Sequence, residues 1–137
     1  KNVKHPILVE CQDHILMAKM DVKLMIQVVL NLIDNAIKYT PEGTEIKITA
    51  EKQENRIFVR VADLGEGIPD EIKEKVFEMF FTDKHKIADS RRSLGLGLSL
   101  CKSIVEAHGG KITLTDNVPH GAVFCFTLPA DEVNMNE

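Results

Sequence analysis

Four segments of the chain alternate apolar and polar residues with a period of two, and this alternation limits the possible folds more than any other feature. They are residues 44–52, 56–63, 111–116 and 121–129. A period of two predicts β-strands with one apolar face. Glu54 and Asn55 fit a tight turn between the first two strands. In the last strand we expect Phe124, Phe126 and Leu128 to face inward. Strands of this kind need a second layer that covers their apolar face.

Three other segments have the signatures of helices. From Asp21, a candidate N-cap, to about Tyr39, apolar residues recur at the i, i+3 and i+4 spacings of a wide helical face. Residues 69–81 predict a short helix with a proline near its first turn. Residues 97–108 predict another helix, and the Gly109–Gly110 pair is a typical stop signal.

Two shorter apolar runs, residues 5–11 and 14–20, are predicted to be strands joined by a turn. The predicted order is two strands, a helix, two strands, two helices and two strands. This order is typical of a two-layer α/β sandwich, with about three helices over one face of a mixed, mostly antiparallel sheet. We expect residues 1–137 to form a single domain whose tail from residue 130 is frayed.

The composition excludes several functional classes. A formal net charge of -4 argues against a general nucleic-acid-binding protein, which would need a basic surface. No apolar run approaches the roughly 20 residues that a membrane-spanning helix needs. The 3 cysteines and 5 histidines lack the spacing of zinc ligands. We therefore expect this domain to contact neither nucleic acid nor a membrane.

A polar stripe runs along the first predicted helix beside its apolar face. It consists of Gln27, Asn31, Asn35 and Lys38. Leaving a carboxamide buried and unpaired costs roughly 1–3 kcal/mol, so such side chains need partners. The stripe either forms a polar wall that meets a ligand, or its amides cap or bond a neighbouring loop.

Two glycine motifs follow at strand and helix ends. In "ADLGEGIP", Asp63 ends a predicted strand, and Gly65 and Gly67 lie in the turn after it. In "SLGLGLSL", Gly95 and Gly97 open a helix, where backbone N–H groups can approach an anion. The second motif is no P-loop, because no Gly-Lys-Ser/Thr follows. Taken singly, the first motif also fits an ordinary turn, and the second also fits a helix start whose glycines serve only close packing.

The order of the motifs resembles the ATP-binding domain of sensor histidine kinases, which has the Bergerat or GHKL fold. In that family's terms the chain has an N box at 31–40, a G1 box at 63–68, an F box at 77–81 and a G2 box at 95–98. The resemblance covers roughly residues 5 to 129. Ser93 departs from the pattern, because many relatives have a further glycine there. Residues 88–110 and 116–129 also look like the potassium-responsive sensor kinases of the KdpD type.

For individual residues the resemblance implies a site for Mg-ATP. Asn35 would give its side-chain oxygen to Mg²⁺, Lys38 would neutralise phosphate oxygens, and Asp63 would accept a hydrogen bond from the adenine amine. Asn31 and Lys38 would act in catalysis, and residues 82–93 would form a mobile lid. The nucleotide-binding residues would be Asn31, Asn35, Lys38, Tyr39, Asp63, Gly65, Gly67, Ile68, Phe80, Arg92, Leu94, Gly95, Leu96, Gly97 and Leu98.

Asn31 bears on the kind of reaction. Relatives of this fold that hydrolyse ATP or phosphorylate serine carry a glutamate at this position, where it acts as general base. An amide cannot take that proton, so the acceptor must already be nucleophilic, as a neutral imidazole is. This favours histidine phosphorylation. The alternatives are a protein-serine kinase of the anti-sigma type and a degenerate module that binds nucleotide or a partner without catalysis.

None of the chain's histidines has the family's acceptor signature, in which an acidic residue follows the histidine. The resemblance therefore implies that the acceptor lies on separate dimerisation helices of the same sensor kinase, with a response regulator as an indirect partner. It also implies that the chain is the cytoplasmic domain of a membrane-anchored bacterial receptor.

Overall fold

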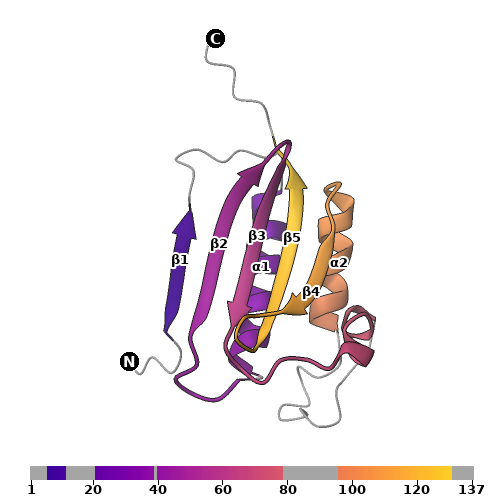
Figure 1. Ribbon diagram of the computed structural model, residues 1–137. Helices are drawn as coiled ribbons and strands as arrows, with labels where there is room; N and C mark the ends of the chain where they lie inside the picture. The colour runs from indigo at the N-terminus through magenta and orange to yellow at the C-terminus, as the bar shows by residue number, and fades with distance from the viewer. Residues whose placement is uncertain (1–5, 12–20, 39, 79–95, 131–137) are drawn as a thin grey trace, which may run out of the picture.

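The computed structural model describes residues 6–11, 21–38, 40–78 and 96–130. Its five-stranded sheet has the order β1-β2-β3-β5-β4. The strands are β1 (Ile7–Cys11), β2 (Ile46–Gln53), β3 (Arg56–Asp63), β4 (Ile112–Asp116) and β5 (Ala122–Pro129). β1 pairs with β2 in parallel, and the other neighbours pair antiparallel. The helices α1 (Val22–Lys38) and α2 (Leu96–Ala107) pack against each other on one face of the sheet (Figure 1). The predicted two-layer α/β sandwich with a mixed, mostly antiparallel sheet is confirmed.

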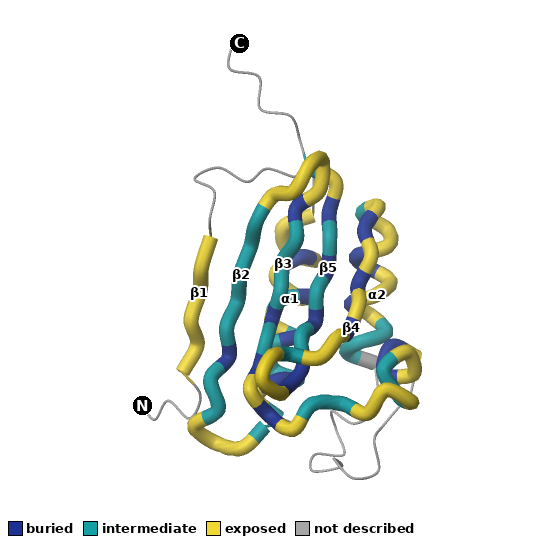
Figure 2. Tube along the Cα trace, in the orientation of Figure 1, coloured by how far each residue is buried: buried dark blue, intermediate teal, exposed yellow. Residues whose placement is uncertain are grey.

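The core lies between the sheet and the two helices. As predicted, Phe124, Phe126 and Leu128 face inward, and each is only 2% exposed. They pack in one cluster with the buried face of α1, which consists of Met25, Val28, Leu32 and Ala36. Burying a large apolar side chain contributes about 1.5–3 kcal/mol, so this cluster holds the two layers together. The edge strand β1 is exposed along its whole length (Figure 2).

The start of α1 and the end of α2 have the predicted caps. Asp21 Oδ1 accepts a hydrogen bond from the Leu24 N–H at 3.2 Å, so Asp21 is the N-cap. His108 joins this cap to α2, because its Nε2 accepts from the Asp21 N–H at 3.0 Å. The chain leaves α2 through Gly109, whose φ is +82°.

The prediction of one short helix over residues 69–81 is wrong for its described part. Residues 70–77 form two single 3₁₀ turns, η1 (Asp70–Ile72) and η2 (Lys75–Phe77), and the backbone becomes extended at Glu78. Phe77 is buried and meets the Phe124 ring edge to face, with ring centroids 6.0 Å apart. An isolated helix this short is marginal, so the tertiary contact of Phe77 decides the local conformation.

Some expectations fall on residues that the structure does not describe. The second predicted strand, residues 14–20, lies outside the described residues, as does the tail from residue 131. The single-domain boundary stays a prediction. None of the described helices has the length and apolar character needed to cross a membrane.

Candidate functional site

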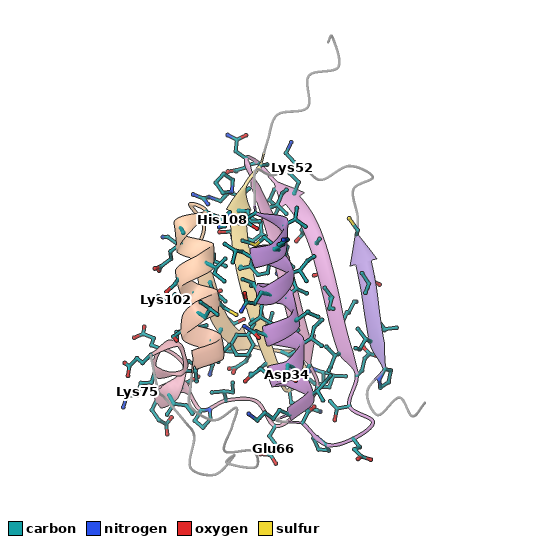
Figure 3. All side chains as sticks on the ribbon, turned by 180° about the vertical axis from the view of Figure 1, so that it is seen from behind. Asp34, Lys52, Glu66, Lys75, Lys102 and His108 are labelled. Atoms are coloured by element: carbon teal, nitrogen blue, oxygen red, sulfur yellow. The ribbon has the colours of Figure 1, made fainter. Side chains whose placement is uncertain are left out.

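The motifs singled out in the sequence meet at one end of the sandwich. The C-terminal end of α1, the C-terminal end of β3 and the N-terminal end of α2 all lie at the lower end in Figure 1. Figure 3 shows the same end from behind, with Asp34 on α1 and Glu66 in the turn after β3. The fold therefore brings together residues more than sixty positions apart, from Asn35 to Gly97.

Asp63 is the one buried charged side chain in the described part of the chain, with 7% of its surface exposed. Its Oδ1 accepts hydrogen bonds from the Gly65 N–H at 2.9 Å and the Ala122 N–H at 3.3 Å. No described residue donates a hydrogen bond to Oδ2. A buried carboxylate needs its oxygens paired, so this arrangement fixes the orientation of the group and leaves one strong acceptor for a ligand.

The turn after Asp63 is packed tightly against the end of α1. A Cβ at Gly65 would lie 2.6 Å from Thr40 Cγ2, and Thr40 itself donates a hydrogen bond to the Ala36 carbonyl at 2.7 Å. Gly67 has a φ of +86°, a conformation that favours glycine. Both glycines are therefore required by the protein's own packing and backbone, in addition to any approach of a ligand.

The predicted polar stripe of α1 is half-buried at Asn31, Asn35 and Lys38. Asn31 lies at the contact with α2 beside Cys101, whose thiol donates a hydrogen bond to the Val28 carbonyl at 3.7 Å. Burial raises the pKa of Cys101 to about 11, and the nearby Asn31 side chain lowers it by a smaller amount. At Asn31 the stripe therefore meets a side chain of a neighbouring helix, whereas the sequence had suggested a ligand or a neighbouring loop as the partner.

The start of α2 closes the site from the other side. Leu98 packs against the core cluster. A Cβ built on Gly97 would meet no atom within 4 Å, so glycine is not required there by contacts with the described residues. The first backbone N–H groups of an α-helix have no partner within the helix, so the start of this helix of 12 residues can face an anion. Several predicted site residues lie outside the described residues, namely Tyr39, Phe80, Arg92, Leu94, Gly95 and the lid 82–93, and the Leu96 side chain is not described either.

The loop between β4 and β5, which contacts the turn after Asp63, was not predicted from the sequence to belong to the site. Asn117 Nδ2 donates a hydrogen bond to the Asp63 carbonyl at 2.7 Å, and His120 Nδ1 lies 2.9 Å from the Gly65 carbonyl. β5 runs antiparallel to β3, so the start of β5 must lie beside the end of β3. The polar stretch "DNVPHG" just before a predicted strand was the available signal.

The comparisons with known proteins agree with this geometry. Residues 20–132 match the family described as "Histidine kinase-, DNA gyrase B-, and HSP90-like ATPase". The sensor protein KdpD of Clostridium acetobutylicum is 43% identical over 127 residues, which are 93% of this chain and 14% of that protein. The chain therefore spans only a small part of this relative.

Two solved structures give the same result. The catalytic domain of histidine kinase ThkA, in a nucleotide-free form, has a TM-score of 0.79 at 38% identity over 92% of this chain and 80% of that domain. Histidine kinase ThkA in complex with the response regulator protein TrrA has a TM-score of 0.76 at 38% identity, covering 93% of this chain and 34% of that one.

Proposed function

The chain belongs to the histidine kinase-, DNA gyrase B- and HSP90-like ATPase family, as a catalytic domain of the histidine-kinase type, and from this premise we propose how it works. It binds Mg-ATP at the end of the sandwich where α1, β3 and α2 meet. It then transfers the γ-phosphoryl group to a histidine on separate dimerisation helices of the same sensor kinase. The observation that carries the proposal is the buried carboxylate of Asp63, with one oxygen held by two backbone N–H groups.

Asp63 selects the base. Adenine presents an exocyclic amine, which can donate a hydrogen bond to the Asp63 oxygen that no described residue uses. Guanine has an oxygen at the corresponding position, and two acceptors facing each other in a buried site repel. The site therefore binds ATP in preference to GTP. Ile68 is partly buried and packs against the core cluster. In the proposed site it borders the base.

The phosphates lie between α1 and the start of α2. Asn35 holds Mg²⁺ and Lys38 neutralises phosphate oxygens, while the space at Gly97 and the N–H groups of the first turn of α2 receive the phosphate chain. When bound, Mg²⁺ offsets the negative charge that collects on the phosphates during transfer. The donor set fits this ion, because Mg²⁺ usually takes only one or two protein oxygens and draws the others from phosphate and water. Within the described ranges, no three His, Cys, Asp or Glu side chains come together to hold a metal.

Other contacts proposed from the resemblance are Tyr39, Phe80, Arg92, Leu94, Gly95 and Leu96 around the phosphates and lid. Asn31 supports histidine as the acceptor, because an amide provides no general base for water or a serine hydroxyl. The Asn31 amide lies beside Cys101 at the α1–α2 contact.

The wider setting follows from the relatives. The KdpD relative is a sensor protein, and ThkA is seen with a response regulator. We therefore place this domain on the cytoplasmic side of a membrane-anchored bacterial receptor that passes phosphate to a response regulator. A potassium stimulus rests on the KdpD likeness alone.

Isothermal titration of the chain with Mg-ATP, Mg-GTP and ATP plus chelator tests the proposal. Asp63→Asn should lose about 10- to 100-fold in ATP affinity, the range expected when a charge-assisted hydrogen bond is removed. The new amide can donate to guanine, so GTP binding should improve. Glu66→Gln is the matched control, because it removes the same charge from an exposed position in the same turn. Equal ATP affinity for wild type and Asp63→Asn would remove Asp63 from its role.

A further inference from the structure

We infer that the loop between β4 and β5, residues 117–121, holds in place the turn that contains Asp63 and Gly65. Within this loop, Asn117 and His120 are positioning residues for adenine selectivity. The inference rests on the proposed role of Asp63. It concerns residues that contact neither the base nor the phosphates in the proposed site, and that act through the Asp63 carboxylate.

Asn117 is held on three sides. Its Nδ2 donates a hydrogen bond to the Asp63 carbonyl at 2.7 Å, and its Oδ1 accepts from the Val118 N–H at 2.8 Å. Its own N–H donates to the Gly121 carbonyl at 2.9 Å, which closes the loop. The side chain therefore has one defined orientation, and it fixes the backbone of Asp63 from outside the turn.

His120 holds the turn at a second point. Its Nδ1 lies 2.9 Å from the Gly65 carbonyl, which can only accept, so Nδ1 must carry the proton. The contact fixes Gly65, whose N–H in turn donates to Asp63 Oδ1.

Gly121 and Ala122 complete the contact between the loop and the turn. A Cβ at Gly121 would lie 2.0 Å from the Asp63 carbonyl oxygen, and the φ of Gly121 is +111°, so only glycine fits. A Cβ at Gly67 would lie 3.2 Å from the Gly121 carbonyl oxygen. The Ala122 N–H gives Asp63 Oδ1 its second hydrogen bond.

These contacts give the two oxygens of the Asp63 carboxylate different roles: Oδ1 binds the protein, and Oδ2 is left for the base. The loop and the turn together fix Asp63 Oδ1 and the carbonyl groups of Asp63 and Gly65 by hydrogen bonds. These bonds set the direction in which Oδ2 points. If Asn117 or His120 is removed, the turn gains freedom and Oδ2 loses its fixed direction. Hydrogen bonding to adenine then weakens, and so does the repulsion of guanine. The ratio of ATP to GTP affinity should fall, which a general loss of folding would not produce.

The test compares single variants of the whole chain by titration with Mg-ATP and Mg-GTP, with thermal unfolding of each. Asn117→Ala and His120→Ala should each lower the ATP-to-GTP affinity ratio by about 5- to 10-fold, the size expected for one lost hydrogen bond. His120→Asn should restore most of the ratio, because its amide N–H can take the place of the Nδ1 donor. Val118→Ala is the control, since Val118 lies in the same loop and is 86% exposed.

An unchanged ratio in folded His120→Ala, or no recovery in His120→Asn, would overturn the inference. Wild type and Asp63→Asn are measured alongside. If wild type does not prefer ATP, or if Asp63→Asn keeps that preference, the proposed function fails and the inference fails with it. If both behave as proposed and only the loop variants match wild type, the inference alone is wrong.

Discussion

The two ends of the sandwich differ in how their polar groups are hydrogen-bonded. At the end opposite the site, the polar groups that join the elements bond to one another. His108 is the example, because its Nδ1 lies 2.7 Å from the Ile104 carbonyl while its Nε2 accepts from the Asp21 N–H. At the site end, Asp63 is buried with one oxygen that no described residue bonds.

This difference indicates that the end opposite the site contributes mainly to stability and that the site end contributes mainly to ligand binding. Groups at the end opposite the site that bond only to one another raise the free energy of unfolding, and we do not expect them to affect ligand binding. In the proposed site Asp63 Oδ2 pairs with the ligand, and binding to the folded state then raises that free energy. Substitutions at the two ends should therefore have separable effects.

Gly110→Ala, at the end opposite the site, should have the largest effect. A Cβ there would lie 1.7 Å from the Thr127 carbonyl oxygen, so the backbone of α2 or β5 must move. We expect a loss of about 3 kcal/mol or more in the free energy of unfolding, measured with urea. Nucleotide affinity of the molecules that remain folded should be close to wild type. A normal unfolding midpoint would contradict the packing described for this end.

His108→Ala should have the next largest effect. It removes the acceptor for the Asp21 N–H and the link from Asp21 to the last turn of α2. Two hydrogen bonds correspond to about 1–2 kcal/mol of unfolding free energy. The ATP-to-GTP affinity ratio should not change. A changed ratio would show that the two ends are coupled, and it would contradict the expectation that substitutions at the two ends have separable effects.

Gly97→Ala is the counterpart at the site end. The new methyl group meets no atom within 4 Å among the described residues, and alanine favours a helix over glycine by up to about 1 kcal/mol. Stability should be equal or slightly higher, while Mg-ATP affinity should fall about ten-fold because the methyl group takes space proposed for phosphate. Unchanged Mg-ATP affinity would move the phosphates away from the start of α2.

Lys73 gives the smallest effect and a pH dependence. Its pKa is raised above the ordinary 10.5, first by its hydrogen bond with Asp70 and then by that with Asp116, which lies 3.0 Å away. A raised pKa in the folded state means that this stabilisation is complete below pH 10.5 and is lost as the pH rises through the folded pKa. Urea unfolding above pH 10.5 should therefore weaken wild type more than Lys73→Met. Parallel curves for the two proteins would show that the contact adds nothing to stability.

The regular elements could be predicted because their signals are local. The period of two in β3 and β5 and the Asp21 cap need no knowledge of distant residues, and each was confirmed. The η1 and η2 turns could not be predicted, because Phe77 takes its place from Phe124. The parallel pairing of β1 with β2 is likewise decided by a partner that lies beyond α1 in the chain.

The site follows the same division. Asp63 at a strand end was visible in the sequence, and its burial agrees with the role proposed for it. Asn117 and His120 were not, because they meet the turn across separations of 54 and 55 residues. Only the pairing of β3 with β5 brings them there, and that pairing is a property of the sheet.

The most direct test of the proposed activity is transfer of labelled γ-phosphate from ATP, measured with and without the dimerisation helices of the full-length protein. The chain alone should bind ATP. It should not label itself, because none of its histidines has the acceptor signature, and it should release hardly any phosphate, because Asn31 offers no general base for water. With the helices present, label should appear on them and should be acid-labile and base-stable, as phosphohistidine is. An acid-stable label, or rapid phosphate release by the chain alone, would contradict the histidine-kinase proposal and favour a serine kinase or a hydrolase.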